Sequence, residues 1–128
     1  MTEEIKVSNN KTLLIVDDSK ISRMMTKAII VDKHPEINIF EAADGVEALE
    51  QSENINFDYY SVDYNMPKMD GIEFISVMME KQSPAKFALL TANIQDATHE
   101  KAKKIGAKCF NKPISETCIL AMLEYFNE

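Results

Sequence analysis

The sequence predicts an α/β fold: a doubly wound parallel sheet of five strands, with five helices packed on its two faces. Five short apolar or β-branched runs alternate with five amphipathic segments along the 128 residues, the order expected when crossover helices connect the strands. The first run, Leu-Leu-Ile-Val at 13–16, is apolar throughout, as in a strand buried on both faces. This length allows one domain with one core. We therefore expect residues 1–10 to form a flexible tail and residues 11–128 to form the folded domain.

Each predicted element has a local signal. In the first half, the pattern predicts strand 13–16, helix 20–31, strand 37–42, a short helix after Asp44-Gly45 and strand 57–62. Ser19 is the expected N-cap of the first helix, and Pro35 follows its end because the residue before a proline leaves the helical region. In the second half, the pattern predicts helix 70–81, strand 87–90, helix 95–105, a short strand around Cys109-Phe110, and a final helix with Ile119, Met122, Leu123 and Phe126 on one stripe.

Helix 95–105 differs from the others in how few apolar side chains it offers. Its apolar anchors are Ala97, Ala102 and Ile105. Burial stabilises by roughly 25 cal/mol per Å² of apolar surface, so this helix is expected to be the least firmly held.

The composition excludes several classes of protein. With 14 basic and 21 acidic residues the net charge is −7, which argues against direct binding of nucleic acid. The sequence has no apolar run of the roughly 18 residues that a membrane span needs, and its start, MTEEIKVSNN, lacks the apolar core of a secretory signal. The two cysteines make neither a disulfide framework nor a metal cluster. We therefore expect a cytoplasmic protein that does not insert into a membrane.

Polar residues stand where the predicted strands end. Asp17-Asp18 follow the first strand, Asp63 the third, Thr91 the fourth and Lys112 the fifth. Because parallel strands with right-handed crossovers have their carboxyl ends at one edge of the sheet, these side chains should meet there.

Such a group of carboxylates is expected to hold a metal. Carboxylates about 4 Å apart repel by about 4 kcal/mol at an effective dielectric near 20, so a cation should enter. Mg²⁺ fits best, with Mn²⁺ as a substitute, because both accept oxygen ligands in octahedral geometry. No histidine or cysteine stands in a ligand cluster at these predicted strand ends, which argues against zinc.

The chemistry that suits this site is phosphoryl transfer, which needs positioning and charge neutralisation more than acid or base catalysis. An aspartate can itself be the nucleophile and form an aspartyl phosphate. The expected roles are nucleophile for Asp63, metal ligands for Asp18 and Asp17, phosphoryl counter-ion for Lys112, and hydrogen-bond donor for Thr91. On charge alone, Asp17 or Asp18 could equally be the nucleophile.

Four motifs resemble the receiver family of response regulators in two-component signalling, particularly its stand-alone, chemotaxis-type members. They are LLIVDDSKISR at 13–23, SVDYNMPKMDG at 61–71, LLTA at 89–92 and NKP at 111–113. The resemblance implies a flavodoxin-like sheet with strand order 2-1-3-4-5. It makes Asp63 the phosphoacceptor, and it makes Asp17, Asp18 and the backbone carbonyl of Asn65 the metal contacts beside Asp63. Thr91 becomes the switch hydroxyl and Lys112 the counter-ion. It also implies a cis bond between Lys112 and Pro113.

One position departs from the family pattern. The family usually has a switch aromatic three residues before its lysine, where this chain has Cys109, with Phe110 one residue later. The interval from Gly106 to Lys112 is also one residue shorter than usual. Either the fifth strand shifts so that Phe110 becomes the switch, or the aromatic switch is absent.

The predicted function is that of a single-domain response regulator in chemotaxis-type or phosphorelay signalling. Asp63 accepts a phosphoryl group from a histidine kinase, a phosphotransfer protein or a small acyl phosphate, and the change is expected to alter partner binding at the face of the fourth helix, fifth strand and fifth helix. Such a protein is expected to be no enzyme beyond its own phosphorylation and autodephosphorylation. The family resemblance implies that Asn65 and Asn93 tune the rate of autodephosphorylation. It is expected to be a monomer or a weak dimer.

Three alternatives remain at this point. A phosphorylation-independent interaction module could use the same scaffold. An aspartyl-phosphate phosphatase would need a second aspartate two residues after the nucleophile, where this chain has Asn65. A flavin-binding protein is disfavoured because DDSK stands where a flavin phosphate would want glycine, serine and threonine.

Overall fold

The fold is a five-stranded sheet flanked by five helices in a computed structural model that describes residues 10–92 and 96–128. Along the chain the elements are β1 (Thr12–Val16), α1 (Lys20–Lys33), β2 (Asn38–Ala42), α2 (Gly45–Asn54), β3 (Tyr59–Asp63), α3 (Gly71–Glu80), β4 (Lys86–Thr91), α4 (Asp96–Lys104), β5 (Lys108–Asn111) and α5 (Glu116–Phe126). The predicted tail lies outside the described residues, apart from Asn10. No helix in the described ranges is long and apolar enough to cross a membrane.

The five strands are parallel and lie in the order β2-β1-β3-β4-β5, which confirms the order that the family resemblance implied. The chain leaves β1 for β2 at one edge and then crosses back over β1 to β3. The winding therefore reverses at the carboxyl ends of β1 and β3. In open parallel sheets, ligands bind at such a switch point.

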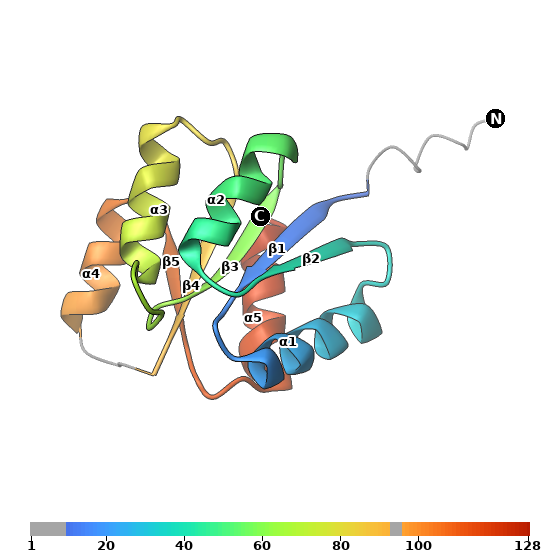
Figure 1. Cartoon of the computed structure of the whole chain (residues 1–128). Coiled ribbons are helices and arrows are strands. Elements are labelled where there is room, and N and C mark those ends of the chain that lie inside the picture. The colour runs from blue at the N-terminus through green and yellow to red at the C-terminus, as the bar shows by residue number, and fades with distance from the viewer. Residues whose placement is uncertain (1–9, 93–95) are drawn as a thin grey trace.

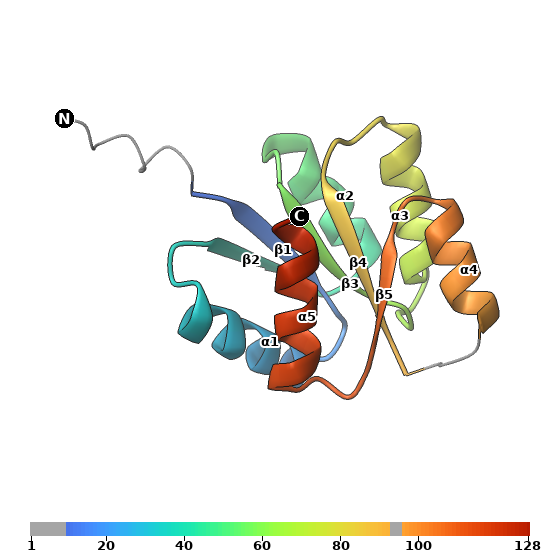
Figure 2. The ribbon, with the colours of Figure 1, turned by 180° about the vertical axis from the view of Figure 1, so that it is seen from behind.

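Helices cover both faces of the sheet (Figures 1 and 2): α2, α3 and α4 lie on one face, and α1 and α5 on the other. Successive strand residues point to opposite faces, so Leu14 and Val16 join one core cluster while Leu13 and Ile15 join the other. All four of these side chains are at most 1% exposed. The strand that carries Asp17 at its end is therefore fixed by packing on both sides.

Side chains at four helix starts supply the capping that their sequence predicts. The N-caps of α1, α2, α3 and α5 accept a hydrogen bond from the backbone N–H three residues later, and they are Ser19, Asp44, Asp70 and Ser115. At α3 the capping is reciprocal, because Glu73 also accepts from the Asp70 backbone N–H at 2.9 Å. All four of these helix starts follow loops at the carboxyl edge of the sheet, so the caps also fix those loops.

β3 begins at Tyr59, two residues later than predicted. The preceding Asp58 forms hydrogen bonds with Thr12, the first residue of β1. Its carboxylate accepts from the Thr12 N–H at 2.9 Å, and its own N–H donates to the Thr12 carbonyl at 2.9 Å. Phe57 is buried in the core just before the strand, so its apolar character reflected packing rather than sheet pairing. At its other end β3 extends to Asp63.

α4 is buried through different residues than the sequence predicted. Ala102 is fully buried as expected, and Ile105, directly after the helix, is partly buried. Ala97 is exposed, whereas Thr98 is 5% exposed, so the inward face is turned by one residue at the start of the helix. The predicted start at residue 95 lies outside the described residues. Ala102 is thus the one fully buried apolar side chain of α4 among those described.

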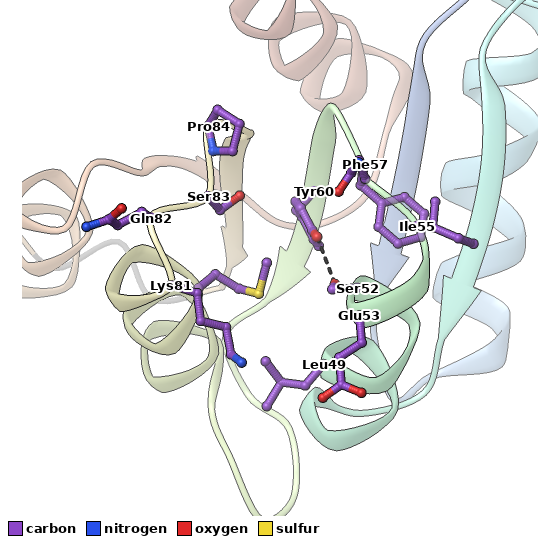
Figure 3. Close-up of a pocket in the computed structure, with 12 residues that line it drawn as sticks. Leu49, Ser52, Glu53, Ile55, Phe57, Tyr60, Lys81, Gln82, Ser83 and Pro84 are labelled. Atoms are coloured by element: carbon purple, nitrogen blue, oxygen red, sulfur yellow. Dashed lines mark hydrogen bonds between the residues drawn. The ribbon is translucent and has the colours of Figure 1, made fainter.

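A surface pocket of about 270 Å³ lies between the ends of α2 and α3, next to the amino ends of β3 and β4 (Figure 3). Phe57 and Tyr60 form part of its wall, and the Tyr60 hydroxyl hydrogen-bonds the Ser52 hydroxyl at 2.8 Å. Because Asp63 ends β3 and Tyr60 is near its start, the pocket lies away from the edge that carries the acidic residues.

Candidate functional site

Four segments bring the predicted site residues to the carboxyl edge of the sheet. Asp17 directly follows β1, Asp63 ends β3, Thr91 ends β4 and Lys112 directly follows β5. The Lys112 N–H donates to the Thr91 carbonyl at 2.8 Å, which ties the last two segments together. Thr91 is 1% exposed. The convergence predicted from strand ends is therefore present.

The carboxylates of Asp17, Asp18 and Asp63 form one acidic cluster. One oxygen from each lies within 4.8 Å of the others. Asp17 and Asp63 are 3% and 5% exposed, whereas Asp18 is exposed to solvent. A donor set made only of carboxylate oxygens, with one side open, suits a hard divalent cation that keeps some of its water. The cluster can therefore hold Mg²⁺. Asn65 lies in the exposed loop that follows β3.

Lys112 faces two of these carboxylates. Its ammonium Nζ lies 2.9 Å from Asp63 Oδ1 and 3.7 Å from Asp17 Oδ2. Burial lowers the pKa of Lys112, but the hydrogen bond and charge of Asp63, together with Asp17 and Asp18, outweigh burial and raise it. Lys112 is thus held as a cation beside Asp63. The bond from Lys112 to Pro113 is cis, as the resemblance implied.

The two buried carboxylates carry more negative charge than one ammonium offsets. Burial raises the pKa of Asp63, against the hydrogen bond from Lys112, and the neighbouring Asp17 raises it further. Burial likewise raises the pKa of Asp17, against the Ser19 N–H and Lys112. Both carboxylates are therefore less easily ionised than in water, and a bound cation would favour their ionised forms.

The loop after Asp63 closes tightly under the strand end. The Tyr64 N–H donates to the Leu90 carbonyl, and the Gly71 N–H donates to the Tyr64 carbonyl, each at 2.9 Å. A Cβ on Gly71 would lie 2.6 Å from the Asp63 carbonyl oxygen and 2.6 Å from the side chain of Leu89. Glycine is therefore needed for α3 to begin so close to Asp63. Asp70 is the N-cap of α3, so Asp70 and Gly71 serve to start this helix.

Arg23 on α1 also contacts this region, although its role was not predicted from the sequence. Its Nη1 donates to the Asp17 backbone carbonyl at 2.7 Å, and its Nε pairs with Glu41 Oε1 at 3.0 Å. The sequence feature that could have pointed to this contact is an arginine six residues after Asp17, in the first turn of the helix that follows the strand. That spacing has no local periodic pattern, so only the folded turn reveals the contact.

Cys109 and Phe110 lie on opposite faces of β5. Cys109 packs against the cluster under α3 and α4, where its thiol lies 4.0 Å from the Thr98 carbonyl, whereas Phe110 joins the cluster under α5. Their pairing partners on β4 are Leu89 and Leu90, and strand alternation gives Thr91 the face of Leu89. Of the two candidate switch residues, Cys109 therefore shares the face of Thr91. Asn93 lies outside the described residues.

Known proteins resemble this chain over most of its length. A family model described as the response regulator receiver domain matches residues 13–124. The chain is 37% identical over 113 residues to the chemotaxis protein CheY of Listeria monocytogenes, covering 88% of this chain and 94% of that protein. It is 39% identical over 100 residues to CheY of Thermotoga maritima, covering 78% and 82%.

Solved structures have the same fold. Chemotaxis protein CheY4 of Vibrio cholerae superposes with a TM-score of 0.81 at 29% identity, covering 91% of this chain and 98% of that chain. A chain of the CheX-CheY-BeF₃-Mg²⁺ complex from Borrelia burgdorferi gives 0.84 at 30% identity, covering 92% and 90%. With a family model over almost its whole length and CheY proteins similar in sequence and structure, the chain belongs to the family of response regulator receiver domains.

Proposed function

We propose that this receiver domain accepts a phosphoryl group on Asp63 and thereby regulates a protein partner in the cytoplasm. The observation that supports this most directly is the ammonium of Lys112, 2.9 Å from Asp63 Oδ1, inside a cluster of three carboxylates. In this proposal Asp63, Asp17, Asp18 and the backbone carbonyl of Asn65 hold Mg²⁺, or Mn²⁺ in its place. The cation would screen the negative charge of the phosphoryl oxygens.

The transfer step needs little covalent chemistry from the protein. An Asp63 carboxylate oxygen attacks phosphorus, the bond from phosphorus to the donor histidine nitrogen or acyl oxygen breaks, and the electron pair leaves with the donor. Lys112 pairs with a phosphoryl oxygen, and Thr91 donates a hydrogen bond to another. Asp63 is favoured over the other two aspartates because its Oδ1 lies 2.9 Å from Lys112 Nζ, whereas Asp17 Oδ2 lies 3.7 Å away. Asp17 Oδ1 accepts from the Ser19 N–H at 2.9 Å.

The donor is a histidine kinase, a phosphotransfer protein or a small acyl phosphate, and the partner binds the face formed by α4, β5 and α5. The Borrelia burgdorferi complex that resembles this chain contains BeF₃ and Mg²⁺ together with CheX and CheY, and we extend a phosphoryl-like ligand with Mg²⁺ to the Asp63 cluster. Asn65 and Asn93 would tune the lifetime of the phosphoryl group. The domain would act as a monomer or a weak dimer, with no activity beyond its own phosphorylation and autodephosphorylation.

Intact-protein mass spectrometry tests this proposal. After incubation with acetyl phosphate and Mg²⁺, the wild type should gain the mass of one phosphoryl group, and Asp63→Asn should gain none. Asp32→Asn is the matched control, because Asp32 is an exposed aspartate on α1, and it should be labelled like the wild type. An unlabelled wild type, or equal labelling of Asp63→Asn, would contradict the proposal.

A second candidate function is partner binding that does not depend on phosphorylation. Cys109 favours it, because a thiol occupies the position where the family usually has a switch aromatic, and the side chain is already partly buried against α4. Partner affinity that stays equal in wild type, with or without acetyl phosphate, and in Asp63→Asn would favour this candidate. Affinity that rises only in the phosphorylated wild type would exclude it.

A further inference from the structure

The Arg23 guanidinium joins three parts of the fold beside the acidic cluster. From the first turn of α1 it donates to the backbone carbonyl of Asp17 at 2.7 Å and pairs with Glu41 near the end of β2 at 3.0 Å. The Arg23 side chain is 15% exposed. Because the donors of a guanidinium form a rigid planar fork, the two contacts fix the direction in which Asp17 is held.

The turn that carries Asp17 and Asp18 is also held by other contacts of Asp17 itself. The Asp17 N–H donates to the Ala42 carbonyl at 3.1 Å, and Asp17 Oδ1 accepts from the Ser19 N–H at 2.9 Å. Asp17 Oδ2 is the oxygen that lies 3.7 Å from Lys112 Nζ. Arg23 therefore holds the carbonyl of a residue whose carboxylate is already oriented by its neighbours, and Asp18 follows directly in the same turn.

We infer that Arg23 is a positioning residue for the divalent-cation site, acting through the backbone of Asp17. The inference rests on the proposed function, since it assumes that the acidic cluster binds Mg²⁺. Partners of metal ligands typically change affinity by 10- to 100-fold when they are removed, because they orient the ligands. We expect Arg23 to fall in that range and to act without touching the ion.

Whether the loss of Arg23 weakens or strengthens Mg²⁺ binding distinguishes a positioning role from a purely electrostatic one. Removing a cation near an acidic cluster should strengthen Mg²⁺ binding, because one repulsive charge is lost. Removing a positioning contact should weaken it. Lys27 provides the matched control, because its ammonium on the same helix lies 3.7 Å from the same Glu41 carboxylate, yet its side chain is 47% exposed.

Isothermal titration of the full chain with MgCl₂ tests the inference. Arg23→Met should weaken Mg²⁺ binding by about tenfold, although it removes a positive charge, whereas Lys27→Met should leave the affinity unchanged or slightly higher. Arg23→Lys keeps the charge but loses the planar fork, so it should fall between Arg23→Met and the wild type. Circular dichroism at the titration temperature checks that each variant is folded.

The titrations distinguish a failure of the proposed metal site from a failure of the role inferred for Arg23. A wild type that binds no Mg²⁺ contradicts the metal site itself. A wild type that binds, with Arg23→Met within twofold of it, overturns the role of Arg23. Equal losses in Arg23→Met and Lys27→Met overturn it as well. If Arg23→Met does not fold, Arg23→Lys decides, and wild-type affinity in that variant overturns the inference.

Discussion

At the scale of single residues, Gly71 shows how closely the site depends on local packing. A Cβ there would meet the Asp63 carbonyl and the Leu89 side chain at 2.6 Å, whereas a Cβ on Gly45 would meet the flexible Met69 sulfur at 2.8 Å. Each glycine is the first residue of a helix with an aspartate N-cap, so Gly45→Ala is a matched control for helix propensity.

Gly71→Ala should therefore lower the free energy of unfolding by about 1–3 kcal/mol, the usual cost of overpacking, and Gly45→Ala should lower it less. Urea titration of both variants measures the difference. Equal changes in the two variants would contradict the close approach of Gly71 to Asp63.

The charge of Asp63 should make stability depend on pH. Burial raises the pKa of Asp63 above its ordinary value of 3.8, so ionisation costs more in the folded than in the unfolded chain. The stability that this carboxyl contributes is greatest below pH 3.8 and is lost as the pH rises through its folded-state pKa. In EDTA at pH 7, Asp63→Asn should therefore be more stable than the wild type.

Urea unfolding of the wild type and Asp63→Asn at a series of pH values measures this effect. The advantage of Asp63→Asn should narrow as the pH falls. A wild type that is more stable than Asp63→Asn at pH 7 without metal would contradict the balance of charge described for the cluster.

A site residue could be predicted where its role is linked to a pattern in the nearby sequence, such as the end of an apolar strand. The convergence of Asp17, Asp63 and Lys112 followed from strand ends alone, because parallel strands end at one edge. Arg23 could not be found this way, since its contact with the Asp17 carbonyl depends on how the turn folds back. The face of Cys109 was also undetermined, because a shortened loop before β5 left its register open.

At the scale of elements, α4 should be the least protected helix. Ala102 is its one fully buried apolar side chain among those described, whereas α3 buries Phe74, Ile75 and Met78. With little apolar area against the sheet, α4 should open locally without global unfolding. Its slowest amide protons should exchange at least tenfold faster than those of α3, a difference of about 1.4 kcal/mol.

Hydrogen exchange followed by NMR measures this difference. Buffer without Mg²⁺ is used, so that both helices are compared in the same state. Protection in α4 equal to that in α3 would show that α4 is held by contacts other than apolar burial. That result would contradict the expectation that α4 is the least firmly held helix.

Element boundaries were predicted less well than the elements themselves. Apolar periodicity identified the strands and helices in order, but Phe57 packs in the core before β3 begins. Apolar character alone does not distinguish these two environments. In α4, periodicity assigned Ala97 to the buried face, while Thr98 takes that place. Alanine is too small for its burial to control how the start of a helix rotates.

At the scale of the whole molecule, Mg²⁺ should stabilise the fold by mass action. A ligand that binds only the folded state raises the free energy of unfolding by about 2.7 kcal/mol when its free concentration is a hundred times its dissociation constant. Thermal unfolding of the wild type should therefore shift upward with Mg²⁺ and return with EDTA. Asp18→Asn should lose most of this shift, because Asp18 contributes one of the clustered oxygens. An unchanged shift in Asp18→Asn would contradict its place in the metal site.

The order of strands is a property of the whole molecule that periodicity could not supply. Apolar runs predict which segments are strands, but they do not predict which strands become neighbours. In the sheet, β1 pairs both with β2, the next strand along the chain, and with β3. The resemblance to receiver domains supplied the order 2-1-3-4-5, and the sheet has it. Once the order is known, the winding reverses beside Asp17 and Asp63, and the position of the site follows.

The proposed function depends most on Asp63 being the phosphoacceptor. Borohydride reduction after incubation with acetyl phosphate and Mg²⁺ converts an aspartyl phosphate to homoserine, which tandem mass spectrometry can locate in the chain. We predict homoserine at position 63 in the wild type and none in Asp63→Asn. Homoserine at position 17 or 18, or none in the wild type, would contradict the role of Asp63 as phosphoacceptor.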